Sequence, residues 1–248
     1  MLSLAGVASA TISSKLKIRS GGHREEEESP HRWGMVIDLN ACVGCGDCTL
    51  ACRANNDVPE EISWNRVLEV DQQGDETVYA TVPCMHCANP PCVGVCPVGA
   101  TYQRSDGIVM MDYDRCIGCR YCQMACPYGA RSFNWREFTE PNSAVPDYGT
   151  PEVERRPRGV VEKCTFCYQR IDRGLAMGLT PGVDREATPA CVNACPVGAR
   201  IFGDLNDPES RISQVLEQNT AIRLFEDKGM EPRVYYLPRH QQAKEGES

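Results

Sequence analysis

Hydrophobic residues in this chain come in short runs separated by charged and turn-forming segments, which predicts many short elements joined by long loops. The predicted strands are residues 34–39, 64–70, 77–82, 100–104, 108–112, 159–161 and 234–237. The predicted helices are residues 49–54, residues 169–177 and a last helix that Asp207-Pro208 begins and that ends near Gln218. Residues 136–158 carry four prolines among charged residues and predict a loop. Ser105-Asp106-Gly107 predicts a hairpin turn between residues 100–104 and 108–112. Short strands, hairpins and few helices indicate an α+β fold.

The two ends of the chain predict no packed structure. Residues 1–12 are mostly small and apolar, and Ala8-Ser9-Ala10 resembles a signal-peptidase site. This stretch is too short to span a bilayer, and it lacks both the basic start of an export signal and the arginine pair of twin-arginine export. Residues 1–32 are therefore expected to be a signal-like or disordered tail, and residues 241–248 a loose tail.

Among the features of the composition, the cysteine content indicates most about the function of the chain. The 248 residues carry a net charge of −8, which argues against a nucleic-acid partner because phosphate binding needs basic patches. Aromatic residues are few, at 7%, and hydrophobic content is ordinary, at 42%. The chain has 16 cysteines, enough for bound cofactors to cross-link distant backbone points and replace part of a core.

These cysteines form four runs with a common spacing. Three cysteines at three-residue steps, followed by a fourth four residues on, form the bacterial ferredoxin run for [4Fe–4S] clusters, in which the fourth cysteine binds the other cluster of a pair. The second run has two extra residues, and the fourth a long insertion, between the second and third cysteines. The runs are Cys42, Cys45, Cys48 and Cys52; Cys84, Cys87, Cys92 and Cys96; Cys116, Cys119, Cys122 and Cys126; and Cys164, Cys167, Cys191 and Cys195. Four runs predict four [4Fe–4S] clusters.

Two other uses of cysteine fit this pattern less well. Disulfide frameworks do not need repeated three-residue steps. Zinc sites usually take two separated pairs, and three cysteines within seven residues crowd a small tetrahedral ion. His86 lies between Cys84 and Cys87; with four cysteines in its run, it is expected to hydrogen-bond to sulfur rather than to bind iron.

No motif predicts a reaction catalysed by this chain alone. The sequence has no Gly-x-Gly-x-x-Gly run and no phosphate-binding Gly-Lys-Thr/Ser run. A cluster held by four thiolates has no open iron for a substrate, so its chemistry is one-electron transfer. The chain is expected to be a non-catalytic electron carrier within an oxidoreductase.

The order of the runs resembles a known family. Cys-Met-His-Cys-Ala-Asn-Pro-Pro-Cys at residues 84–92 and Cys-Ile-Gly-Cys-Arg-Tyr-Cys at residues 116–122 are similar to the electron-transfer subunits of complex iron–sulfur molybdoenzymes, such as dimethyl sulfoxide, polysulfide and tetrathionate reductases. The resemblance implies two ferredoxin-like [4Fe–4S] modules, the second inserted into the first. Residues 33–82 and 159–240 would form the first half, and residues 83–158 the second half with a linker.

The same resemblance implies how the runs share clusters. The four implied ligand sets are Cys42, Cys45, Cys48 and Cys195; Cys164, Cys167, Cys191 and Cys52; Cys84, Cys87, Cys92 and Cys126; and Cys116, Cys119, Cys122 and Cys96. Some relatives have tryptophan at the position of Cys119 and hold a [3Fe–4S] cluster there. Cysteine at this position implies four full [4Fe–4S] clusters.

The resemblance further implies partners. Electrons would pass between a molybdopterin catalytic subunit near the Cys42 cluster and a membrane-anchor, quinone-reactive subunit near the Cys116 cluster. The chain would then be peripheral on the membrane through these partners, on the outer face if residues 1–12 derive from an export signal and otherwise on the cytoplasmic face. The alternatives are the iron–sulfur subunit of a molybdenum-free respiratory membrane complex of the sulfate-reduction type, and a free multi-cluster ferredoxin.

Overall fold

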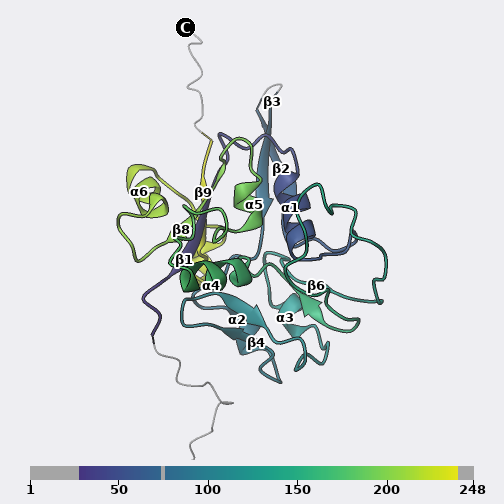
Figure 1. The fold of residues 1–248 in the computed structure, drawn as a ribbon. Coiled ribbons are helices and arrows are strands. Elements are labelled where there is room, and N and C mark those ends of the chain that lie inside the picture. The colour runs from purple at the N-terminus through teal and green to yellow at the C-terminus, as the bar shows by residue number, and fades with distance from the viewer. Residues whose placement is uncertain (1–27, 74–75, 240–248) are drawn as a thin grey trace, which may run out of the picture.

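The computed structural model describes residues 28–73 and 76–239 (Figure 1). The signal-like stretch expected at residues 1–12 and the tail expected at residues 241–248 lie outside this part of the chain.

A three-stranded sheet joins the two ends of the described chain. Its middle strand, β1 (Trp33–Asp38), pairs antiparallel with β8 (Arg200–Asp204) and parallel with β9 (Val234–Leu237). Residues 33–37 of β1 are all buried, which accounts for the continuous apolar run in the sequence. The predicted edge strand at residues 234–237 is confirmed, whereas β8 was not predicted.

The remaining strands make three two-stranded antiparallel sheets. These are β2 (Arg66–Gln73) with β3 (Glu76–Val82), β4 (Thr101–Gln103) with β5 (Val109–Met111), and β6 (Ser132–Phe133) with β7 (Val161–Glu162). The predicted hairpin turn contains Gly107, with φ of +86°. A Cβ at Gly107 would lie 1.0 Å from Nη1 of Arg233, so another residue here would strain the backbone and displace the Arg233 guanidinium.

The helices are short, and several lie within the cysteine runs. They are α1 (Asp47–Asn55), α2 (Pro91–Gly94), α3 (Tyr121–Met124), α4 (Tyr168–Ala176), α5 (Ala190–Asn193), α6 (Arg211–Gln218) and the 3₁₀ helix η1 (Glu226–Lys228). In the described part of the chain, no helix has the length and apolar character needed to cross a membrane. The predicted start of α6 was wrong: Asp207 and Pro208 lie in the preceding turn, and the Ser210 hydroxyl accepts the N-terminal hydrogen bond from the Ser213 amide at 3.3 Å.

Helices from distant runs pack in pairs. Helix α1 of the first run packs against α5 of the fourth, while α2 of the second run packs against α3 of the third. Figure 1 shows the first pair in the upper half of the molecule and the second pair in the lower half. Each half therefore has cysteines from two runs facing one another.

A buried ion pair ties the long loop at residues 136–158 to the rest of the molecule. Nε of Arg156 donates to Oε2 of Glu162 at 2.6 Å, and both side chains are almost fully buried. The guanidinium also donates to the backbone oxygens of Asn56 at 2.5 Å and Asp57 at 2.8 Å, just beyond α1. Nε1 of Trp64 donates to the same Glu162 oxygen at 3.1 Å. One arginine thus connects the loop to α1 and β7.

Candidate metal centres

The four cysteine runs fold alike. The first two cysteines of each run lie outside the helices, and the third lies in a short helix: Cys48 in α1, Cys92 in α2, Cys122 in α3 and Cys191 in α5. The fourth cysteine follows the helix closely, except in the longer α1, which still contains Cys52. The common spacing therefore produces a common local structure that presents three thiols in one direction.

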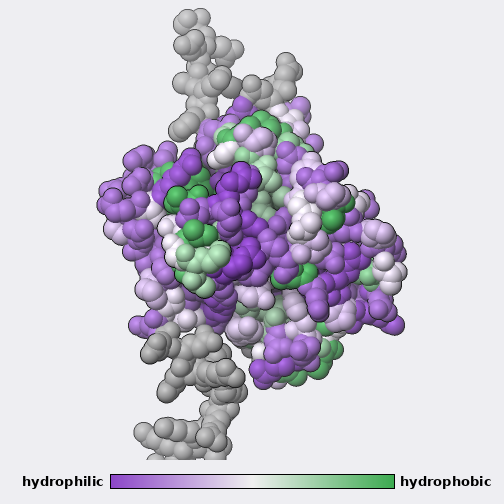
Figure 2. Space-filling view, viewed as in Figure 1, coloured by the Kyte–Doolittle hydropathy of each residue, from purple (hydrophilic) through white to green (hydrophobic). Residues whose placement is uncertain are grey.

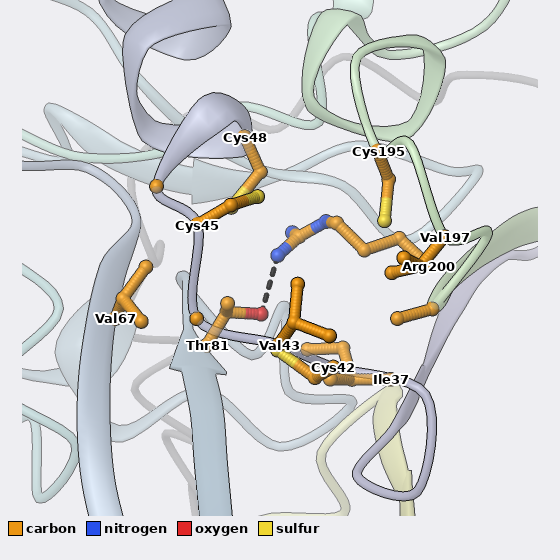
Figure 3. A pocket seen from close by; sticks show the side chains of 13 residues that line it. Ile37, Cys42, Val43, Cys45, Cys48, Val67, Thr81, Cys195, Val197 and Arg200 are labelled. Carbon is orange, nitrogen blue, oxygen red and sulfur yellow. Dashed lines mark hydrogen bonds between the residues drawn. The ribbon is translucent and has the colours of Figure 1, made fainter.

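Three cavities are each lined by four cysteines, and we number them as sites. Site 1, in Figure 3, has a volume of about 350 Å³, site 3 about 310 Å³ and site 4 about 270 Å³. Their cysteines are Cys42, Cys45, Cys48 and Cys195 in site 1; Cys84, Cys87, Cys92 and Cys126 in site 3; and Cys96, Cys116, Cys119 and Cys122 in site 4. The structure thus brings together three of the four sets that the resemblance implied.

The remaining cysteines gather at a fourth place, site 2, which is fully buried. Site 2 consists of Cys52, Cys164, Cys167 and Cys191. Burial raises the pKa of Cys52 well above its usual value, and the charges of the other three site 2 thiols raise it further. Burial likewise raises the pKa of Cys191 to about 11.

Thiol pairs from different sites show which sites are neighbours. Cys48 of site 1 raises the pKa of Cys191 in site 2. Burial, then Cys191, then Cys84 of site 3 raise the pKa of Cys164 in site 2 to about 12. Site 2 is therefore the spatial neighbour of both site 1 and site 3.

Site 4 lies next to site 3. The pKa of Cys122 in site 4 is raised by burial and by Cys92 of site 3. The four sites consequently form a row in the order 1, 2, 3, 4.

Comparison with known proteins identifies iron–sulfur domains in this chain. Residues 76–140 and 115–199 each match the 4Fe-4S dicluster domain family, and residues 33–54 match a 4Fe-4S binding domain. The chain is 46% identical over 221 residues to a putative dimethyl sulfoxide reductase iron-sulfur subunit of Halobacterium salinarum, covering 83% of this chain and 78% of that protein. It is 44% identical over 230 residues to the iron-sulfur cluster-binding subunit of menaquinone reductase of Nitratidesulfovibrio vulgaris, covering 85% and 90%. A tetrathionate reductase subunit of Salmonella typhimurium is 40% identical over 221 residues, covering 86% and 75%.

The chain belongs to the family of dimethyl sulfoxide and tetrathionate reductase iron–sulfur subunits. Its ferredoxin-like 4Fe–4S domains mix small helices with short strands, as the α+β prediction required. It is an iron–sulfur electron-transfer subunit of the reductase type.

The two ends of the row in this iron–sulfur subunit are the most open. Cys45 of site 1 and Cys119 of site 4 are exposed, and each of these sites has two further cysteines of intermediate exposure. All four cysteines of site 2 are buried, as are three of the four in site 3. The end sites are therefore more accessible from the surface than the middle sites, which are shielded from water.

Polar side chains outside the runs donate hydrogen bonds to the cysteine sulfurs. Nδ2 of Asn65 lies 3.1 Å from Sγ of Cys48, and Nδ2 of Asn56 lies 3.5 Å from Sγ of Cys167. Hydrogen bonds to sulfur are a main determinant of cluster potential, so both asparagines are placed where they would adjust the potential of a bound cluster. Sequence reasoning missed them because their partners lie 17 and 111 residues away.

His86 of the iron–sulfur subunit has a different role from the expected one. Its Nδ1 accepts a hydrogen bond from the Val109 amide at 3.1 Å, and its ring stacks on Phe166 with 3.8 Å between centroids. Nε2 has no hydrogen-bond partner among the described residues. The predicted hydrogen bond to sulfur was therefore wrong. Burial, and then the charge of Lys163, hold the pKa of His86 well below its usual range, so the ring is a neutral core group.

The donor set and the space around it fit an iron–sulfur cluster. Within residues 28–73 and 76–239, no three His, Cys, Asp or Glu side chains are placed to hold a single metal ion. At sites 1, 3 and 4, four thiols instead surround a cavity. Four thiolates are the ligand set of a [4Fe–4S] cluster.

Gly118 provides a test of the loop around site 4. It lines the site with φ of +69°, and a Cβ would lie 2.3 Å from the Gly159 backbone oxygen. Gly118→Ala is expected to displace the loop and weaken cofactor binding at site 4, measured as lower iron content and loss of one paramagnetic signal.

Gly178 is the matched control for this substitution. Its φ is +74°, but no described atom lies within 4 Å of its would-be Cβ. Gly178→Ala therefore introduces only the left-handed backbone strain, about 1–2 kcal/mol. Equal iron loss in both variants would show that strain, rather than the contact with Gly159, disturbs the site.

Proposed function

We propose that this iron–sulfur subunit relays single electrons through four [4Fe–4S] clusters between a molybdopterin catalytic subunit and a membrane-anchor, quinone-reactive subunit. The observation that carries the proposal is the row of four four-cysteine sites with its most exposed thiols at the two ends. When bound, each cluster supplies a one-electron couple. The surrounding residues hold the thiolates in place, exclude water from the middle of the row and adjust the potentials.

The proposed ligands are the cysteines of sites 1 to 4 as defined above, and the proposed architecture is one ferredoxin-like half inserted into another. Residues 33–82 and 159–240 would hold sites 1 and 2, and residues 83–158 would supply all ligands of sites 3 and 4. Pairing of β1 with β8 and packing of α1 on α5 support the first half. The β4–β5 hairpin and the packing of α2 on α3 support the second.

Apolar side chains near both end sites support docking of partners there. Ile117, which lines site 4, and Tyr121 and Met124 of α3 are exposed, as is Trp135, which stacks under the Arg120 guanidinium at 4.5 Å. Figure 2 shows a largely hydrophilic face with separate hydrophobic patches, one of them at the lower edge. At site 1, Val43 and Val197 are exposed (Figure 3).

These apolar surfaces fit the proposed partners. We assign the surface near site 4 to the membrane-anchor subunit and that near site 1 to the catalytic subunit. Membrane association would then come through the partners, and residues 1–12 favour the outer face.

Metal analysis tests the cofactor content. Protein prepared without oxygen is expected to contain about 16 irons and as many acid-labile sulfides per chain, because four sites would each hold one [4Fe–4S] cluster. Spectra of the reduced protein should show interacting clusters. About four zinc ions per chain without sulfide would contradict the proposal.

Co-purification tests the partners. An affinity tag on this chain, with the membranes solubilised in mild detergent, is expected to retain a molybdenum-containing subunit and a membrane subunit in fixed proportion. Retention of a membrane subunit without molybdenum would favour a molybdenum-free respiratory complex instead. Recovery of the chain alone, with all its clusters and from soluble extract, would favour a free ferredoxin.

A further inference from the structure

Three buried cations in this protein face cysteine sites instead of carboxylates. Arg131, Lys163 and Arg200 are 3%, 0% and 4% exposed. None of them forms a salt bridge among the described residues. By contrast, buried Arg156 pairs with Glu162. A buried charge without a partner is costly, so the three cations require negative groups that the protein acquires when its sites are filled.

Arg131 lies between sites 3 and 4. Its Nη2 donates to Sγ of Cys92 in site 3 at 3.0 Å. Its Nη1 donates to Oγ1 of Thr101 at 3.3 Å and Sδ of Met111 at 3.0 Å, and both of these residues line site 4. One guanidinium thus contacts a ligand of one site and the wall of the next.

Lys163 lies between sites 2 and 3. It directly precedes Cys164 of site 2, and its ammonium donates to the Cys164 backbone oxygen at 2.7 Å. The same ammonium donates to the backbone oxygen of Val109, which lines site 3 together with Cys84. The junction between sites 2 and 3, like the junction between sites 3 and 4, therefore contains one cation.

Arg200 lies between sites 1 and 2. It lines site 1, where Figure 3 shows its guanidinium extending across the cavity toward Cys45 and Thr81. It donates to Thr81 and, at 3.1 Å, to Oδ1 of Asn65, whose amide nitrogen contacts Cys48. Its Nη2 donates to Sδ of Met35 at 3.1 Å. The thiol of Cys191 in site 2 is also an electrostatic neighbour of this guanidinium.

We propose that Arg200, Lys163 and Arg131 are positioning residues of the relay, one fixed positive charge at each junction, and that each raises the reduction potential of both flanking clusters. The inference rests on the proposed four-cluster relay. In each transfer one electron leaves one cluster and enters its neighbour, and no atom moves. Because each cation lies between two clusters, it attracts the electron on the first cluster before the transfer and on the second cluster after it. In a buried setting this interaction is far stronger than it is in water.

The two arginines keep their charge in this setting, because an arginine side chain is not deprotonated in proteins. Nη2 of Arg131 contacts Sγ of Cys92 at 3.0 Å, and Arg200 lines the four-thiol site 1. Lysine can lose its charge when it is buried, so the decisive measurements are those on the arginines.

Potentiometric titration of the full-length, cluster-loaded protein, followed by electron paramagnetic resonance, tests the proposal. In Arg131→Gln, the potentials of the site 3 and site 4 clusters are expected to become more negative than in the wild type, with much smaller shifts at sites 1 and 2. In Arg200→Gln, the sites 1 and 2 clusters should shift instead. Arg131→Lys and Arg200→Lys keep the positive charge, so they should return the potentials most of the way to their wild-type values. Iron and sulfide are measured in every sample first.

The double variant Arg156→Gln/Glu162→Gln is the matched control, because it neutralises a buried arginine without changing the net charge, and it should leave all four potentials in place. Unchanged potentials in both glutamine variants, an equal shift of all four clusters, or equal shifts in the lysine and glutamine variants would overturn the proposal. If a glutamine variant loses its clusters, recovery in the lysine variant supports the charge role and loss in both contradicts it. A wild type without four clusters would contradict the proposed function itself, whereas four clusters that do not respond would contradict only this inference.

Discussion

Replacing Cys119 with serine is expected to convert the cluster of site 4 to a [3Fe–4S] form. Cys119 is one of four thiols around site 4 and the exposed one, so the iron it holds would become labile. The oxidised variant should show the paramagnetic signal of a [3Fe–4S] cluster at a higher potential than the original couple. Quinol-linked turnover of the whole complex should fall sharply, while dyes that feed the catalytic subunit directly should still support activity. Cys119→Trp should act in the same direction.

Cys45→Ser is the matched control, because Cys45 has the same place in the first run and is the exposed thiol of site 1. It should change the site 1 signal and leave site 4 intact. A Cys119→Ser variant with four complete clusters and normal quinol turnover would contradict both the ligand assignment and the position of site 4 at the membrane end of the row.

Replacing Arg156 with methionine is expected to destabilise the protein severely. Glu162 is fully buried, its Oε1 has no described hydrogen-bond partner, and its Oε2 depends on Arg156 and Trp64. Removing one partner of a buried ion pair typically costs about 3–5 kcal/mol. For a chain of this size, that corresponds to a thermal midpoint lower by roughly 6–20 °C. Thermal unfolding monitored by circular dichroism in an anaerobic cell measures this shift.

The double variant Arg156→Met/Glu162→Met separates the lost pairing from the lost arginine. Without the carboxylate, no charge is left unpaired, so the double variant should be more stable than Arg156→Met alone. If both variants unfold at the same temperature, the hydrogen bonds from Arg156 to Asn56 and Asp57 would account for the effect instead of the ion pair.

The local features of this fold could be predicted from the sequence. The pattern at residues 49–54 indicated most of α1, and the Asp106-Gly107 turn indicated the β4–β5 hairpin, because neighbouring residues determine both. The short helices α2, α3 and α5 of the other runs were not predicted. The start of α6 was misplaced because two capping residues, Asp207 and Ser210, compete within one turn. Strand β8 was missed because its partner β1 lies more than 160 residues earlier, and a five-residue strand has no independent signal.

The groups between the sites could not be predicted from spacing. In the sequence, Asn65 and Arg200 look like ordinary polar residues, and Lys163 is seen only as the neighbour of Cys164. The folded chain places Asn65 beside Cys48, Lys163 on Val109 of site 3 and Arg200 in the wall of site 1. His86 shows the opposite error, because adjacency to cysteines in sequence suggested a sulfur contact while its ring turns to Phe166 and Val109. Sequence neighbours indicate which residues bind a cluster, whereas its potential depends on residues that are distant in sequence.

The position of β1 between β8 and β9 has a consequence for how the chain matures during synthesis. Sites 3 and 4 draw all their thiols from residues 84–126, which leave the ribosome early. Sites 1 and 2 need Cys195 and Cys191, and β1 finds its neighbours only when residues 200–237 have been made. We therefore expect the iron-loading machinery to fill sites 3 and 4 before sites 1 and 2, which stay open until residues 200–237 have been made.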